Sequence, residues 1–122
     1  MNILLVDDEA IIRAGMRALI PWEEHGYRLV GEAADASQGM AMAMEHRPDI
    51  MLVDIGLPDR NGLSLIEDIQ RVLPACRHII LSCQDAVGGF TQAIQLGVRA
   101  YLLKSTVSPE ELLSVLDRVR ME

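Results

Sequence analysis

The sequence predicts a doubly wound α/β fold, in which one five-stranded parallel sheet of order 2-1-3-4-5 carries helices on both faces. Two observations lead to this prediction. Five short apolar runs, each of the length typical of a buried parallel strand, alternate along the chain with stretches of helical periodicity. Right-handed crossovers between parallel strands then place helices on both faces. Because 122 residues, half of them hydrophobic, can bury one core, we expect a single domain over residues 1–122.

The five predicted strands are apolar runs bounded by polar or turn-forming residues. They cover residues 3–6, 28–34, 50–54, 78–82 and 99–103. The strand order places the third of them at the centre of the sheet.

The first two helices are predicted from periodicity and from end signals. Residues 9–20 form an amphipathic helix that ends at Pro21. Its apolar face consists of Ile12, Met16, Leu19 and Ile20. Ser37 is predicted to cap the second helix, which extends to about His46.

The last three helices differ in how clearly the sequence marks them. A turn-forming loop over residues 56–62 precedes an amphipathic helix. The apolar positions of that helix are Leu63, Leu65, Ile66, Ile69 and Val72. Two glycines weaken the fourth helix, residues 86–96, by about 1 kcal/mol each. Ser108 as N-cap and Pro109 in the first turn mark the start of the last helix.

Charged residues directly follow three of the predicted strands. Asp7 and Asp8 follow the first strand, Asp54 ends the third, and Lys104, the only lysine in the chain, follows the fifth. In open α/β sheets the functional groups lie just beyond the carboxyl ends of the strands. The sequence therefore predicts that three carboxylates and one ammonium share a crevice.

This crevice has the composition of a metal-dependent phosphoryl site. Carboxylates within about 4 Å of one another repel by several kcal/mol at an effective dielectric near 20, so a divalent cation is expected among them. Oxygen ligands favour Mg²⁺, which also accepts phosphate oxygens. Asp54 could attack phosphorus as a nucleophile, while Lys104 supplies a positive charge and Ser82 a hydroxyl donor.

This ordered set of residues resembles the receiver domain of two-component response regulators, over essentially the whole chain. The resemblance implies a CheY-like form of the flavodoxin-type fold, with Asp54 as the phosphoacceptor. It implies a Mg²⁺ site made by Asp7, Asp8, Asp54 and the backbone carbonyl of Gly56. Ser82 and Lys104 would bind the phosphoryl oxygens, and Ser82 with Tyr101 would form the conformational switch.

The same resemblance implies partners. A sensor histidine kinase would donate the phosphoryl group, and the face formed by the fourth helix, fifth strand and fifth helix would read out the change, including homodimer formation. Because the chain ends where the family's last helix stops, we expect it to be part of a longer regulator with a C-terminal DNA-binding domain. No enzymatic activity is expected beyond self-catalysed phosphoryl transfer and slow dephosphorylation.

Two departures from the family pattern bear on the switch and the output. Most receivers place a cis proline after the active-site lysine, whereas this chain has Ser105. Since a cis non-proline bond costs about 3 kcal/mol, we expect a trans Lys104–Ser105 bond or visible strain. This variant resembles regulators with LuxR-type output domains, but residues 21–27 resemble the connection in regulators with AraC-type domains, which are slightly favoured.

Composition excludes other classes of protein. The formal charge of -7 argues against a DNA-binding surface in this chain. With no signal peptide and no run of membrane-spanning length, a cytoplasmic protein without membrane contact is expected. Cys76 and Cys83 lack metal-ligand spacing, so both are expected to be reduced and partly buried.

Two alternative functions remain open at this stage. An aspartyl-phosphate phosphohydrolase similar to the haloacid dehalogenases would use the same nucleophile, metal, hydroxyl and lysine. That family requires a second Asp two residues after the nucleophile, and Gly56 occupies that position. A flavodoxin-like cofactor module or an inert scaffold is the other alternative. The acidic first loop argues against it, because that loop would repel a bare phosphate.

Overall fold

The computed structural model describes residues 1–83 and 87–122. Its centre is a five-stranded sheet of order β2-β1-β3-β4-β5 in which every neighbouring pair is parallel. The strands are β1 (Asn2–Val6), β2 (Arg28–Ala33), β3 (Ile50–Asp54), β4 (Arg77–Ser82) and β5 (Ala100–Leu103). The predicted fold class and strand order are therefore confirmed, with strand boundaries displaced by at most one residue.

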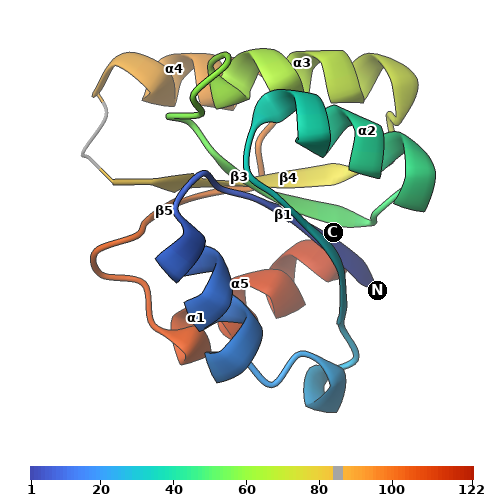
Figure 1. Ribbon diagram of the computed structural model, residues 1–122, viewed down its shortest axis with the longest axis vertical. Coiled ribbons are helices and arrows are strands. Elements are labelled where there is room, and N and C mark those ends of the chain that lie inside the picture. Colours follow the sequence, from blue (N-terminus) through green and yellow to red (C-terminus); the bar gives the residue numbers. More distant parts are fainter. Residues whose placement is uncertain (84–86) are drawn as a thin grey trace.

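The helices form one layer on each face of the sheet. They are α1 (Ala10–Leu19), α2 (Ala36–His46), α3 (Gly62–Val72), α4 (Val87–Gln95) and α5 (Pro109–Arg120), with a short 3-10 turn, η1 (Glu23–His25), before β2. Figure 1 shows α2, α3 and α4 above the sheet and α1 and α5 below it. Among the described residues, no helix is both long enough and apolar enough to cross a membrane.

The two central strands are buried on both faces, which explains their unbroken apolar sequences. Residues 3–6 of β1 and 50–53 of β3 are fully inaccessible to solvent. Alternate residues point to opposite sides: Leu4 and Val6 pack toward α2 and α3, whereas Ile3 and Leu5 pack toward α5. The sheet thus separates two apolar cores, and its two central strands, β1 and β3, carry polar side chains only at their ends.

Helix-capping predictions gave one success and one error. Ser108 caps α5 as expected, because its Oγ accepts a hydrogen bond from the Glu111 N–H at 3.1 Å. Ser37 does not cap α2. The cap is Asp35, whose Oδ1 accepts from the Gln38 N–H at 2.7 Å. Ser37 lies inside the helix because its own N–H donates to Asp59, from the loop after β3.

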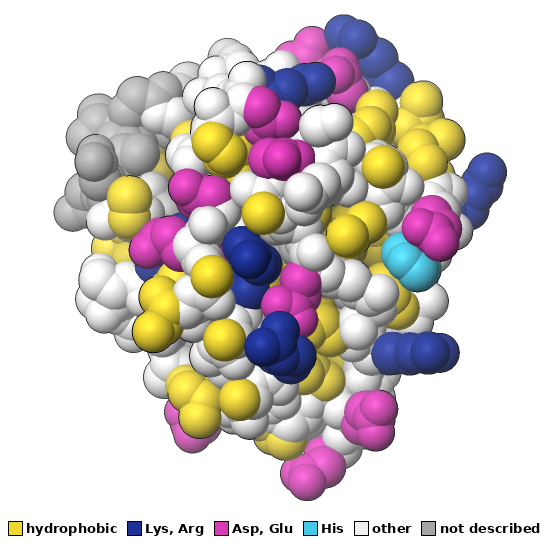
Figure 2. Space-filling view, viewed as in Figure 1, with side chains coloured by type: hydrophobic (Ala, Val, Ile, Leu, Met, Phe, Trp, Pro, Cys, Tyr) yellow, Lys and Arg dark blue, Asp and Glu magenta, His cyan; other side chains and the backbone are white. Residues whose placement is uncertain are grey.

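Three side chains are more exposed than the sequence indicated. Leu19 is 69% exposed and Val72 is 46% exposed, because each lies in the last turn of its helix, beyond the part that covers the sheet. Leu19 lines a surface groove between α1 and α5. Figure 2 shows hydrophobic side chains interspersed with charged ones over the lower part of the molecule, where α1 lies in Figure 1. Both cysteines are free, but Cys83 is exposed, while Cys76 is buried as a core residue.

The expected fourth helix began at position 86, which lies outside the described residues.

The segment between α1 and β2 is held against α5. The Trp22 indole N–H donates to the Met16 carbonyl at 3.0 Å, closing the end of α1. The Tyr27 hydroxyl donates to Asp117 at 2.6 Å, and the Arg120 guanidinium lies 5.1 Å from the centre of the Tyr27 ring. These contacts fix α1 and α5 relative to each other on the lower face of the sheet.

His78 in β4 makes the stability of the fold sensitive to acid. Its side chain is buried, and neither ring nitrogen has a hydrogen-bond partner in the part of the chain that the structure describes. Burial lowers the pKa of His78 to about 4. The His78 imidazole therefore binds a proton near pH 6.5 in the unfolded chain, but only near pH 4 in the folded protein.

Stability from neutral His78 is thus complete above about pH 6.5 and is lost as the pH falls. At pH 5 the expected loss is about 2 kcal/mol. We expect His78→Leu to remove this loss. Between pH 7 and pH 5 the free energy of unfolding should therefore fall more for the wild type than for the variant. Urea denaturation at both values measures it, with the exposed His46→Gln as control. Parallel profiles for His78→Leu and wild type would contradict the prediction.

Candidate functional site

The carboxyl ends of β1, β3, β4 and β5 meet along one edge of the sheet. Val6 is paired with Val53, so Asp7 and Asp54 follow neighbouring positions on adjacent strands. On the other side Ser82 ends β4, and its carbonyl accepts a hydrogen bond from the Lys104 backbone N–H at 2.8 Å. Parallel register thus gathers the four side chains that the sequence placed at strand ends.

Lys104 is the centre of the cluster. Its Nζ lies 2.8 Å from Asp7 Oδ2, 2.7 Å from Glu9 Oε1 and 2.9 Å from Asp54 Oδ2. The contacts with Glu9 and Asp54 are hydrogen bonds, while that with Asp7 is an ion pair without hydrogen-bond alignment. Burial lowers the pKa of Lys104, but the carboxylates outweigh this effect and raise the pKa above its usual value. The ammonium therefore stays charged, with a side chain only 6% exposed.

The carboxylates are crowded into a small volume. Asp7, Asp8, Glu9 and Asp54 each offer an oxygen, and these oxygens all lie within 4.8 Å of one another. Desolvation is the main cause that raises the pKa of Asp7 and of Asp8, and the neighbouring Asp54 carboxylate raises that of Asp8 further. With one ammonium among four carboxylates, the crevice carries excess negative charge.

This donor set fits a small divalent cation. All of the oxygens are hard ligands, and the buried Asp7 Oδ2 accepts no hydrogen bond from any described residue. A cation would relieve both the mutual repulsion and the desolvation that raise the carboxyl pKa values. The residues present are therefore suited to Mg²⁺.

Asp54 is held by both of its carboxylate oxygens. Oδ1 accepts a hydrogen bond from the Gly56 N–H at 3.0 Å, and Oδ2 accepts from Lys104. The side chain is nearly buried, with the residue 4% exposed. The Gly56 carbonyl, predicted to be a metal ligand, remains a prediction, because the contact that the structure shows runs through the Gly56 N–H.

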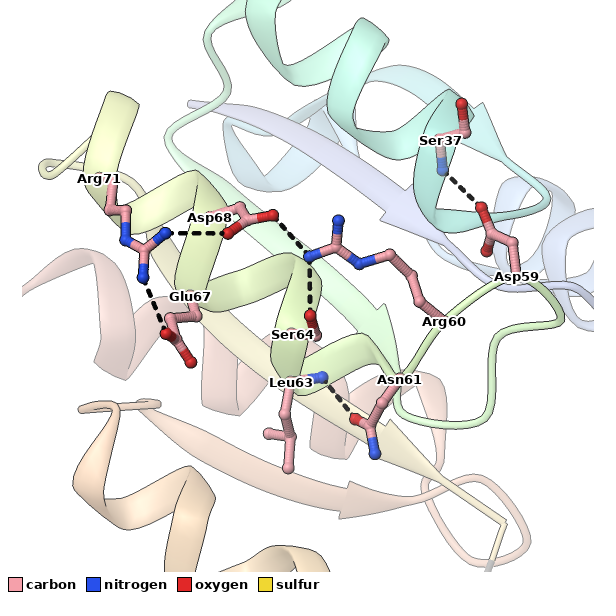
Figure 3. A network of polar contacts seen from close by, with 9 residues as sticks. All are labelled: Ser37, Asp59, Arg60, Asn61, Leu63, Ser64, Glu67, Asp68 and Arg71. Carbon is pink, nitrogen blue, oxygen red and sulfur yellow. Dashed lines mark hydrogen bonds and ion pairs between the residues drawn. The ribbon is translucent and has the colours of Figure 1, made fainter.

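The loop after Asp54 is anchored to two helix N-termini. Asp59 accepts hydrogen bonds from the Ala36 and Ser37 N–H groups of α2 at 2.8 and 2.9 Å, and the Ala36 bond is the main cause that lowers the Asp59 pKa. Asn61 caps α3 by accepting from the Leu63 N–H at 2.8 Å. Figure 3 shows the contacts of Asp59 with Ser37 and of Asn61 with Leu63. They hold the backbone that carries Asp54 and Gly56.

Arg60 ties the same loop to the outer face of α3. Its guanidinium donates to Ser64 Oγ at 2.8 Å and to Asp68 Oδ2 at 2.6 Å (Figure 3). The Arg60 bond is also the main cause that lowers the pKa of Asp68. Sequence reasoning treated positions 56–62 only as a turn and missed these anchors, because the partner of Asp59 lies 23 residues earlier in the chain.

Ser82 and Tyr101, the predicted switch pair, lie on the neighbouring strands β4 and β5. Ser82 is 5% exposed at the crevice edge. Tyr101 is paired with Ile80, and its hydroxyl is buried without a hydrogen-bond partner among residues 1–83 and 87–122. Its ring meets the edge of Phe90 in α4, with ring centroids 5.7 Å apart. The Tyr101 ring is therefore turned into the protein and covered from α4.

Two further observations concern residues beside Lys104. The Lys104–Ser105 peptide bond is trans, one of the two outcomes expected for a receiver that lacks proline here. Glu9 was recognised in the sequence only as part of an acidic loop, yet the structure brings it into hydrogen-bond contact with Lys104. No local signal could identify this contact, which spans 95 residues.

Comparison with known proteins agrees with this geometry. The family model of the response regulator receiver domain matches residues 3–117. An uncharacterized response regulatory protein of Staphylococcus epidermidis is 35% identical over 116 residues, which cover 95% of this chain and 45% of that protein. The transcriptional regulatory protein HptR of Staphylococcus aureus is 35% identical over 103 residues, which cover 84% of this chain and 40% of HptR.

A solved structure matches over nearly the whole fold. The REC domain of AraT, a response regulator from Geobacillus stearothermophilus, has a TM-score of 0.87 and 35% identity, covering 98% of this chain and 95% of that one. The chain spans less than half the length of each of the two Staphylococcus relatives named above. It belongs to the family of response regulator receiver domains, the signalling domains of two-component systems.

Proposed function

We propose that Asp54 is the phosphoacceptor of this receiver domain. The observation that carries the proposal is the placement of its carboxylate: almost buried at the end of the central strand, oriented by the Gly56 N–H, and paired with Lys104 in an acidic crevice. A carboxylate held in this way is positioned as a nucleophile. Its neighbours supply the charge that phosphoryl transfer requires.

In the proposed reaction an Asp54 oxygen attacks the phosphorus of a phosphohistidine. The new O–P bond forms as the N–P bond breaks, and the imidazole nitrogen leaves with the electron pair of that bond and takes a proton from water. Lys104 and Ser82 donate hydrogen bonds to the transferred phosphoryl oxygens. Asp7, Asp8, Asp54 and the Gly56 carbonyl would hold Mg²⁺, which would supply neutralisation of the phosphoryl charge.

The donor and the output are proposed from the same family membership. A sensor histidine kinase supplies the phosphoryl group in the cytoplasm, and a C-terminal DNA-binding domain outside this chain controls transcription. HptR, a transcriptional regulatory protein more than twice as long as the region it shares with this chain, supports this proposal. The acidic net charge of -7 is consistent with leaving DNA contact to another domain.

The readout face is proposed to be α4, β5 and α5. Phosphorylation would draw Ser82 inward and favour the inward position of Tyr101, shifting a pre-existing equilibrium. On α4, Phe90 is 51% exposed and Ile94 is 62% exposed, which offers apolar surface for a second copy of the chain. Both residues lie on the helix that contacts Tyr101, which links the switch to this surface.

The experiment that tests the proposal is intact-mass measurement after incubation with Mg²⁺ and acetyl phosphate. We expect the wild type to gain one phosphoryl group and Asp54→Asn to gain none, because the amide cannot act as the nucleophile. Asp49→Asn, an exposed aspartate just before β3 and at the opposite end of that strand from Asp54, is the matched control and should be phosphorylated like the wild type. Sedimentation of the same samples examines dimerisation.

A phosphoryl group on Asp54→Asn would overturn the assignment. Turnover of a phosphomonoester by the wild type would favour the phosphohydrolase alternative. Against that alternative, position 56 is a glycine whose N–H binds Asp54, so no carboxyl group stands there to protonate a leaving group.

A further inference from the structure

The Lys104 ammonium has no free side for a phosphoryl oxygen in this structure. Three carboxylate oxygens surround Nζ at 2.7 to 2.9 Å. Those of Glu9 and Asp54 accept hydrogen bonds from it, and that of Asp7 forms a close ion pair on the remaining side. The side chain is 6% exposed, so solvent reaches little of it. If Lys104 is to bind a phosphoryl oxygen, one of these carboxylates must first move away from Nζ.

The three carboxylates differ in their freedom to leave. Those of Asp7 and Asp54 have side-chain exposures of 0% and 5%, and each accepts a backbone hydrogen bond two residues on, from Glu9 and Gly56 respectively. The Glu9 side chain is 48% exposed, and among the described residues its one polar contact is with Lys104. Release of a half-exposed ion pair costs little free energy.

The Glu9 backbone would not move during this release. Its N–H donates to Asp7 Oδ1 at 2.8 Å, and its carbonyl accepts from the Ile12 and Arg13 N–H groups of α1 at 3.1 Å. Its side chain makes no capping hydrogen bond to the helix. Rotation of the side chain alone can therefore free Lys104.

We propose that Glu9 is a positioning residue that occupies the phosphoryl-oxygen place on Lys104 and is displaced when the phosphoryl group arrives. The inference rests on the proposed phosphoacceptor function of Asp54 and adds a built-in competitor to it. Glu9 keeps Lys104 aimed into the crevice, but each binding event must first break its contact. The residue thereby weakens phosphoryl binding and slows phosphorylation at low donor concentration.

Two variants separate this competition from general charge repulsion. Glu9→Gln keeps the length and one acceptor oxygen but loses the charge, whereas Glu9→Ala removes both. We expect Glu9→Ala to bind beryllofluoride, a non-covalent phosphoryl analogue, about two- to fivefold more tightly than wild type. The gain for Glu9→Gln should be smaller. The donor concentration giving half-maximal phosphorylation by acetyl phosphate should fall in the same order.

The control is Glu24→Gln, which removes one negative charge from the exposed η1 turn, away from the crevice. Calorimetric titration with beryllofluoride at fixed Mg²⁺ measures affinity at 0.1 and 0.5 M salt, and urea denaturation verifies folding. Competition at 2.7 Å should persist at the higher salt concentration, at which longer-range charge effects are screened.

The outcomes distinguish the role of Glu9 from the role of Asp54. The inference is supported if the affinity for beryllofluoride falls in the order Glu9→Ala, Glu9→Gln, wild type, and if Glu24→Gln binds it as the wild type does. Affinities for Glu9→Ala equal to or below wild type overturn it, as does a gain shared equally by both variants and abolished by salt. In those cases Asp54 still accepts phosphate. Failure of the wild type to bind beryllofluoride or gain a phosphoryl group instead overturns the proposed function itself.

Discussion

Gly62→Ala is expected to destabilise the protein by about 3 kcal/mol or more. A Cβ at position 62 would overlap the Asp54 carbonyl oxygen and lie 3.0 Å from the Asp54 carbonyl carbon and the Ile55 Cα. These are backbone atoms, so no side chain can rotate away. The Gly62 N–H also donates to the Ile55 carbonyl at 2.8 Å, which holds the two segments together. Urea denaturation monitored by circular dichroism measures the effect.

The matched control is Gly15→Ala in α1. A Cβ there would meet nothing within 4 Å, and alanine is the better helix former, so a gain of about 0.5–1 kcal/mol is expected. Because Gly62 lies directly against the backbone of Asp54, any Gly62→Ala protein that folds should also be phosphorylated more slowly. Equal stability of the two variants would show that the close approach at Gly62 is not required.

Lys104→Met is expected to lower the free energy of unfolding by about 3 kcal/mol at neutral pH without divalent cations. Methionine keeps the length and apolar stem of the side chain but removes the charge. The carboxylates of Asp7 and Asp54 would then be buried without their counterion, beside Asp8 and Glu9. Removing one partner of a buried ion pair leaves the full cost of burying the other charge.

Arg71→Met provides the control for this variant. Arg71 also contacts two carboxylates, Glu67 at 3.0 Å and Asp68 at 3.4 Å (Figure 3), but its side chain is 69% exposed. Its loss should cost less than about 1 kcal/mol. Addition of Mg²⁺ should stabilise Lys104→Met more than Arg71→Met, because the crevice of Arg71→Met still contains the Lys104 ammonium as counterion. Equal losses in the two variants, or no response to Mg²⁺, would contradict the electrostatic account of the crevice.

Sequence reasoning predicted the sheet well because burial leaves a local trace. Strands β1 and β3 are buried on both faces, so their sequences are unbroken apolar runs, and the predicted limits of β3 were correct. Helix α5 was equally clear, because Ser108 and Pro109 signal its start in adjacent positions. The errors concern residues whose hydrogen-bond partners lie far away in the sequence. Ser37 has the chemistry of a cap, but Asp35 and Asp59 take the two capping roles.

The site was predictable in membership but not in contacts. Asp7 and Asp54 lie at the ends of the neighbouring strands β1 and β3, and Lys104 follows β5 at the same edge of the sheet, with β4 between β3 and β5. Which oxygen each donor binds depends on how the loops and helices pack around the sheet. The position of the Tyr101 ring against Phe90 is of this kind, since it depends on how α4 packs on β5.

The amino-acid pattern thus specified the fold, the crevice and the charged groups in it, because strand burial and strand order follow from short-range periodicity and general rules of chain connection. Packing decided the rest. The Glu9 contact with Lys104, the anchoring of the Asp54 loop by Asp59 and the close approach of Gly62 to Asp54 join parts of the chain that no local pattern relates. Such contacts depend on distances of a few ångströms between folded segments, and those distances exist only once the two cores have packed around the sheet.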